Sequence, residues 1–157
     1  MGFSRFVIVE DNRWKVKAMM HGEVNKAIRK ACFDIEAQAK RNIQAYNAID
    51  TGAYLNSVYY DTDSHHGYST AASSANAAAS TTGKKSGRTN ESFRMMPEIK
   101  AGPMEGIVAV GAEYGAMLEY GTVYIPPMLP LTMAFNSAIP GFYAAIKDMV
   151  EEVPKRI

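Results

Sequence analysis

Apolar residues recur at intervals of three and four positions across residues 19–45. They are Val24, Ile28, Ala31 or Cys32, Ile35, Ala39 and Ile43, and charged residues fill much of the remainder. This spacing collects the apolar side chains on one face of a helix. No proline interrupts the run, and Asp50-Thr51-Gly52 follows it as a turn sequence. The pattern predicts a long amphipathic N-terminal helix.

Short runs of β-branched and aromatic residues bounded by polar ones predict strands. Such runs fall at residues 3–9, 55–60 and 106–110. We expect residues 98–100 to pair with residues 106–110 as a hairpin with a loop of several residues. The strands together predict a small, mainly antiparallel sheet.

Residues 62–97 differ sharply in composition from the rest of the chain. From Ser69 to Thr82 there is no charged residue and almost nothing but alanine, serine and threonine. Such side chains bury little apolar area, so alone this segment should be flexible and would need another chain to hold it. An alanine-rich helix from Thr70 to Ser80 remains open, although the serines weaken it. Residues 62–97 are therefore predicted to form an inserted arm.

Residues 110–131 combine glycines, aromatic residues and prolines. Gly111, Gly115 and Gly121 let the backbone change direction around Tyr114, Leu118 and Tyr120. Three prolines then lead into a C-terminal helix, in which Pro140-Gly141 predicts a kink or break. Residues 154–157 read as a tail. The sequence predicts a single α+β domain over residues 1–157, with two helices packed on the sheet and a long protruding loop.

Composition and charge narrow the function classes. The formal charge of +1 is too small to produce the broad positive field of a dedicated nucleic-acid binder. Lys84, Lys85 and Arg88 offer at most a weak, local contact to DNA in a channel or to an acidic partner. The apolar runs are too short to span a membrane, and we expect no secretory signal. The lone Cys32 is expected to be a buried small hydrophobe.

Few residues suggest catalytic chemistry. Metal-ligand residue types cluster only at Asp61, Asp63, His65 and His66, where the alternatives are a polar loop and a metal-dependent nuclease or hydrolase. Glu113 and Glu119 could be paired carboxylates, but capping or subunit contact is the commoner role for such residues. We expect no catalytic residue, no cofactor and no metal site.

Three motifs in order resemble a family of tailed-bacteriophage neck proteins, called head-tail joining, head-tail connector or tail-completion proteins. The first is the long basic helix followed by Asp50-Thr51-Gly52 and a Leu-x-x-Ser-hydrophobic strand. The second is the segment from Val110 to Thr122, with its Val-Gly and Glu-Tyr-Gly-Thr elements. The third is the proline-led helix from Pro126 to Ala134. The resemblance covers essentially all of the chain except residues 62–97.

The resemblance implies a structural virion protein that joins head to tail. Such proteins assemble in the host cytoplasm as a ring of identical subunits around the DNA channel, here expected to be a hexamer. They contact neighbouring connector and tail proteins, and a tail-terminator ring is the alternative within this class. Residues expected at such contacts are Tyr114, Met117, Leu118, Glu119, Tyr120, Tyr124, Met128, Phe93 and Met95. For the aromatic residues, core packing is an equal alternative.

Overall fold

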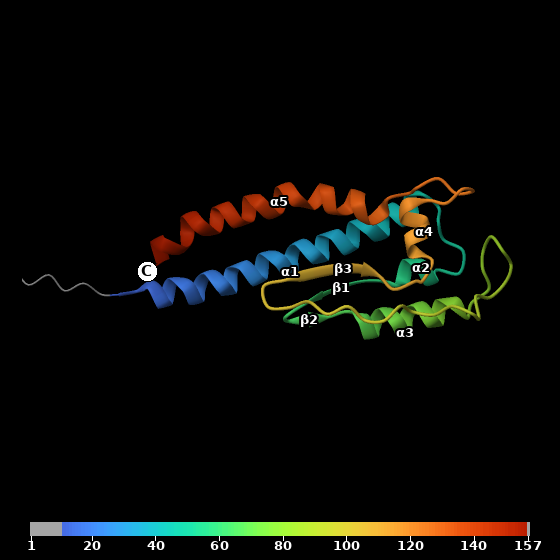
Figure 1. Cartoon of the computed structure of the whole chain (residues 1–157), viewed down its shortest axis with the longest axis horizontal. Helices are drawn as coiled ribbons and strands as arrows, with labels where there is room; N and C mark the ends of the chain where they lie inside the picture. Colours follow the sequence, from blue (N-terminus) through green and yellow to red (C-terminus); the bar gives the residue numbers. More distant parts are fainter. Residues whose placement is uncertain (1–10, 157) are drawn as a thin grey trace, which may run out of the picture.

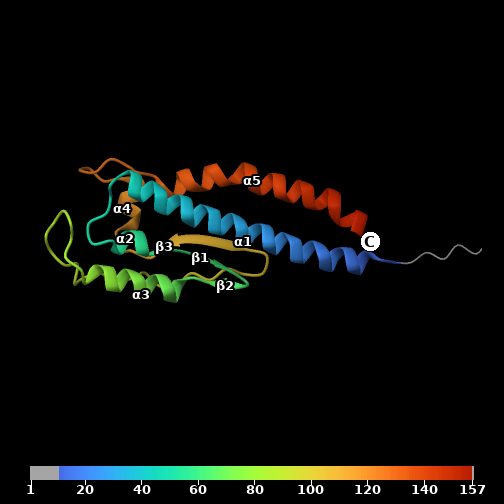
Figure 2. The same cartoon turned by 180° about the vertical axis from the view of Figure 1, so that it is seen from behind.

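Two long helices run side by side over one face of a small sheet, and a shorter helix lies across the sheet from them. In the structure, a computed structural model that describes residues 11–156, the long helices are α1 (Arg13–Ala45) and α5 (Pro130–Glu152). Figure 1 shows α5 above α1 and the sheet between α1 and α3 (Tyr68–Ala79). The view from behind in Figure 2 shows the same order. The α+β class with its two helices is confirmed.

The sheet is antiparallel throughout and has the order β2-β1-β3. Its strands are β1 (Val58–Thr62), β2 (His65–His66) and β3 (Gly106–Val110). All five residues of β1 are buried, and β1 pairs with β3 from Val58 opposite Val110 to Thr62 opposite Gly106. The strand predicted at residues 3–9 lies outside the described residues.

The predicted hairpin between residues 98–100 and β3 is wrong. Residues 98–100 form no strand. Backbone N–H groups in and beside this segment donate to side chains of β1 and not to the backbone of a neighbouring strand. The Ile99 N–H donates to the Tyr59 hydroxyl at 3.2 Å, and the Ala101 N–H donates to Asp61 Oδ1 at 2.9 Å. The partner of β3 is β1. Leu55 also lies outside the strand, in the short helix α2 (Ala53–Asn56).

The two long helices differ from prediction at three points. Helix α1 starts at Arg13, earlier than the periodicity indicated. Of the kink or break expected at Pro140-Gly141, the break does not occur, because α5 continues through Pro140. The side chain of Pro140 is exposed, and α5 packs along α1. The packing of α5 therefore stabilises the helix by more than the one missing backbone hydrogen bond at Pro140 costs. The expected tail begins as a 3₁₀ turn, Val153–Arg156, with Val153 buried.

The alanine-rich segment is largely folded. Residues 68–79 form α3, and Ala71, Ala75 and Ala79 recur every four residues on its buried face. Small side chains let α3 approach α2 and β1 closely, which is how a segment with little apolar area joins the core. The expectation of flexibility is therefore wrong for α3. Residues 80–92 form the protruding loop beyond the end of α3 (Figure 1).

Candidate interaction surface

The three family-like motifs meet at one end of the molecule, where α2 and the short helix α4 (Gly115–Tyr120) lie beside the last turn of α1 and the first turn of α5 (Figure 1). The rings of Tyr54 and Tyr114 have centroids 6.0 Å apart, and those of Phe93 and Tyr114 are 6.3 Å apart. The Met128 N–H donates to the Leu118 carbonyl at 3.0 Å. Segments as far apart in sequence as Tyr54 and Tyr114 thus form one packed unit.

Glu119 links α4 to the start of α5. Its side chain is buried, with 6% of its surface exposed. Its carboxylate accepts hydrogen bonds from the Leu131 N–H at 3.1 Å, the Thr132 N–H at 2.8 Å and the Thr132 hydroxyl at 2.6 Å. The first N–H groups of a helix have no partner within the helix, so the carboxylate satisfies them and opposes the positive end of the dipole. Glu119 is a capping residue.

Residues 121–127 form a loop that we call the tip. The Thr122 N–H donates to the Ile125 carbonyl at 2.7 Å, and the Thr122 hydroxyl accepts from the N–H groups of Tyr124 and Ile125. Gly121 has φ of +77°, and an added β carbon would stand 2.7 Å from the Ile125 carbonyl oxygen. These bonds hold the turn closed. Val123 and Tyr124 are left 94% exposed.

Large exposed apolar side chains adjoin the tip in sequence. Met117 is 56% exposed and Tyr120 is 74% exposed, both on α4. Exposed apolar patches on a monomer commonly mark contacts with other proteins, especially where aromatic residues gather. The tip and the outer side of α4 therefore form a candidate surface for another protein.

The predicted contact residues divide into exposed and packed groups. Met117, Tyr120 and Tyr124 are exposed, whereas Phe93 and Glu119 are buried. Those at intermediate burial are Met95, Tyr114, Leu118 and Met128. The packed group supports the fold from within, and the exposed group is available to a partner.

Sequence reasoning missed Val123, although it is as exposed as Tyr124. It also missed Tyr46, whose hydroxyl lies 3.4 Å from the Met133 sulfur; both side chains are partly exposed apolar groups. The signal that could have identified Val123 was the run of three apolar or aromatic residues, Val123 to Ile125, between Gly121-Thr122 and two prolines.

The basic residues of the protruding loop are held near the Asp50-Thr51-Gly52 turn. Oδ1 of Asp50 accepts the backbone N–H groups of Lys85 at 2.7 Å and Ser86 at 3.0 Å. The ammonium group of Lys85 donates to the Asn47 carbonyl. The hydrogen bonds from Ser86, and to a smaller extent the one from the Lys85 N–H, hold the pKa of Asp50 below its ordinary value. Lys84, Lys85 and Arg88 are exposed, so the loop presents an anchored basic group.

Of the four residues with metal-ligand side chains, Asp61 and His66 pair with each other, and Asp63 and His65 make other contacts. Asp61 is fully buried and lies 2.9 Å from Nδ1 of His66. Asp63 accepts a bond from the Asn25 amide at 2.9 Å, and the His65 ring stacks on Tyr60 at 4.1 Å. Within residues 11–156, no group of three or more His, Cys, Asp or Glu side chains is placed to hold a metal ion. This cluster supports the β1–β2 turn.

Cys32 is buried in α1, and burial raises the pKa of its thiol to about 11. A thiol with that pKa is almost wholly protonated at neutral pH, so it is a poor nucleophile. It packs as a small apolar side chain.

Comparisons with protein-family models, curated proteins and solved structures found no match to this chain. None of the helices in the described part of the chain is long and apolar enough to cross a membrane.

Proposed function

We propose that this chain is a structural protein of the phage neck, which joins head to tail as a homo-oligomeric ring around the DNA channel. The proposal rests on the motif resemblance and on one structural observation. The three motifs that carry the resemblance pack together at one end through Glu119, Tyr114 and the Met128–Leu118 bond. A chance likeness in three separate segments would not require them to form one packed unit.

The exposed tip supports a role in protein contact. Val123 and Tyr124 stand in solvent on a turn whose backbone is held by Thr122, so the turn has its shape before any partner arrives. A turn with a preorganised backbone loses less conformational freedom on binding, and aromatic side chains are common anchors at interfaces. A ring also needs two different patches on each subunit. The tip is well suited to be one of them, toward either a second copy or a neighbouring neck protein.

This proposal makes the chain a virion component that acts without a cofactor and without catalysis. The anchored basic residues Lys84, Lys85 and Arg88 would give DNA in the channel a weak and salt-dependent contact. Three charges spread over one loop suit passage of DNA better than tight binding, because strong phosphate contacts would retain the DNA.

Electron microscopy of particles assembled without this protein tests the function. Full capsids beside unattached tails of normal length are the expected result, with joining restored when the purified chain is added. Overlong tails would instead assign the chain to a terminator ring, and normal joined particles would overturn a neck role of either kind.

A further inference from the structure

Among residues 11–156, β3 pairs on one side with β1 and has no strand on its other edge. The Gly111 N–H donates to the Ser57 carbonyl at 2.8 Å, so residue 111 faces β1. In an antiparallel pair the hydrogen-bonding direction alternates, so Val108 and Val110 direct their N–H and C=O groups away from β1. In the described residues these outward groups have no backbone partner.

This edge also lacks the usual protection against pairing. Its sequence, Gly-Ile-Val-Ala-Val, contains no charge and no proline. Natural edge strands commonly carry such residues because an open apolar edge accepts a strand from another chain. Beside it lies a hollow of about 410 Å³ whose walls include Ile107, Val108, Tyr120 and Phe135. Phe135 is 54% exposed and Tyr120 is 74% exposed, so both the backbone and the side chains offer contacts to an added strand.

Residues 3–9 have the composition of such a strand. They read Phe-Ser-Arg-Phe-Val-Ile-Val, which is rich in aromatic and β-branched residues. They lie outside the described residues and precede α1, which starts at Arg13.

The length of the connection prevents the last residues of this run, Ile8 and Val9, from reaching β3 of their own chain. Gly106 lies against Ile28 and Cys32, where an added β carbon would overlap both side chains. Between Arg13 and Ile28 the helix rises about 22 Å, at 1.5 Å per residue. Val9 lies only four residues before Arg13 and spans at most about 14 Å when extended. β3 runs from Gly106 toward α4, farther still from Arg13 (Figure 1).

We propose that residues 3–9 of a second copy add as a strand to the free edge of β3. The main-chain groups of Val108 and Val110 supply the ladder, and the hollow beside them takes alternate apolar side chains. Each copy then donates one strand and accepts another, which is the head-to-tail contact that closes a ring. The inference deepens the proposed function and rests on it, since it names a contact between ring neighbours.

Cross-linking between two single-cysteine variants tests the contact. Val7→Cys and Val108→Cys, each made with Cys32→Ala, are mixed and treated with a short bismaleimide, which tolerates a one-residue shift in register. One variant carries a tag, so that heterodimers separate by size. We expect at least about tenfold more heterodimer than from Val7→Cys mixed with Thr70→Cys, because docking raises the effective concentration of the paired thiols to millimolar. Thr70 is exposed on α3. Equal yields would overturn the proposal.

A substitution at Val108 provides a second, independent measurement. Val108→Pro removes the outward N–H but leaves the bonds to β1, whereas Val108→Ala keeps that donor and shortens the side chain. Light scattering should show that the proline variant needs about tenfold more protein to assemble, with the alanine variant close to wild type. Assembly of the proline variant at the wild-type concentration would count against strand addition.

Failure of this contact and failure of the proposed function give different results. Rings that form without the cross-link and tolerate Val108→Pro would remove the strand contact but leave the neck role. Particles that join normally in the absence of the protein would remove the neck role, whatever the cross-links show. A purified chain that stays monomeric at every concentration would overturn the strand contact itself.

Discussion

At the scale of single residues, Glu119 connects the tip to the helical frame. Its carboxylate takes three hydrogen bonds from the first turn of α5 while its own backbone belongs to α4. The loop between the two helices is thereby fixed at both ends.

Glu119→Ala should destabilise the fold by about 2–3 kcal/mol, because it removes the cap and leaves buried donors without a partner. Glu119→Gln keeps one acceptor and should cost about 1 kcal/mol. Urea denaturation measures both. Glu113→Ala, an exposed change just before α4, is the control and should stay within about 0.5 kcal/mol of wild type. Equal stability of Glu119→Ala and Glu113→Ala would contradict the capping role.

Asp61 gives the fold a dependence on acid pH. Burial raises the pKa of its carboxyl group, but the bonds from the Ala101 N–H and from His66 outweigh burial, so the pKa falls below its ordinary value of 3.8. The stability that Asp61 contributes is therefore complete above the ordinary value and is lost as the pH falls through the lowered one. Between about pH 4 and pH 2, wild type should lose stability more steeply than Asp61→Asn. Urea midpoints across this range measure the two slopes, and parallel slopes would refute the assignment.

At the scale of elements, α3 shows how an alanine-rich segment becomes part of a core. Its buried face consists of Ala71, Ala75 and Ala79, and Ala75 has no exposed surface. Each side chain is small, so the helix axis can lie close to α2 and β1. Van der Waals contacts at this short distance compensate for the small apolar area that each alanine buries. The serines that argued against a helix fall on the outer side, as Ser73 and Ser74 do.

Ala75→Leu should destabilise the protein by about 1–3 kcal/mol, because three extra carbons do not fit where the helix meets the core. Ala77→Leu lies on the exposed side of the same helix and should change stability by less than about 0.5 kcal/mol. Thermal unfolding of both variants measures the difference. If α3 were a detached arm, the two substitutions would behave alike.

The elements also show which parts of this fold can be predicted from sequence. The long helix was predictable because Ile35, Ala39 and Ile43 repeat with helical spacing, and the turn after it because of Gly52. The partner of β3 could not be predicted. The backbone near residues 98–100 bonds to the side chains of Tyr59 and Asp61 and not to β3, and no local sequence pattern indicates such bonds. Burial of α3 depends on how closely its backbone can approach α2 and β1, and this distance cannot be inferred from composition alone.

The candidate site was predictable in its location but not in its division of roles. Residues 110–131 stood out through their glycines, aromatics and prolines. Whether a given side chain packs or is exposed depends on the path of the backbone after Gly121, where φ is positive. Tyr114 was therefore indistinguishable from Tyr124 in sequence, although Tyr114 packs against Phe93 and Tyr124 is in solvent.

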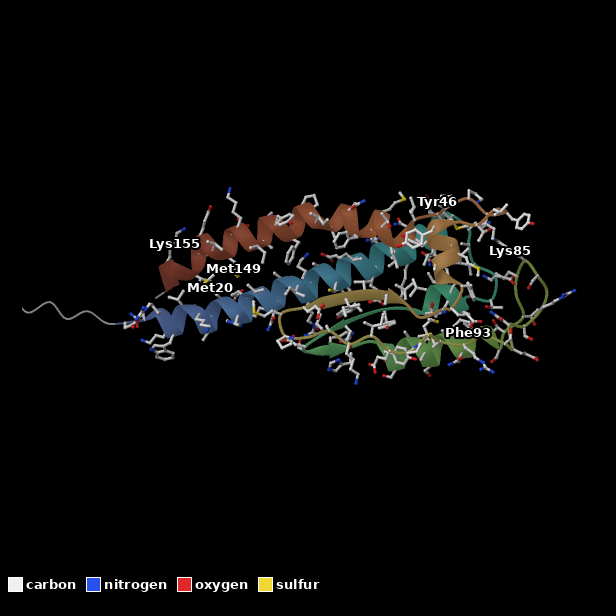
Figure 3. The ribbon with its side chains drawn as sticks, in the orientation of Figure 1. Met20, Tyr46, Lys85, Phe93, Met149 and Lys155 are labelled. Carbon is white, nitrogen blue, oxygen red and sulfur yellow. The ribbon has the colours of Figure 1, made fainter. Side chains whose placement is uncertain are left out.

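At the scale of the whole molecule, the two ends differ. Figure 3 shows Tyr46 and Lys85 at one end, with Met20, Met149 and Lys155 at the other. The first end carries the tip, the protruding loop and all three motifs, and the long helices extend from it (Figure 2). An elongated subunit with unlike ends suits an assembly with a distinct partner at each end, as a junction between two larger structures requires.

Tyr124→Ser tests the tip at this scale. Because the side chain is 94% exposed, its removal should leave the free energy of unfolding within about 0.5 kcal/mol of wild type. A buried aromatic anchor at an interface is worth about 2 kcal/mol or more, so partner binding should fall roughly thirtyfold. Complementation of a phage lacking the protein, with electron microscopy for unattached tails, measures the loss. Val150→Ser, a half-exposed apolar change near the C-terminal end of α5, is the matched control and should complement fully. Full complementation by Tyr124→Ser would show that the tip makes no essential contact, and the search for the partner surface would move to the outer side of α4.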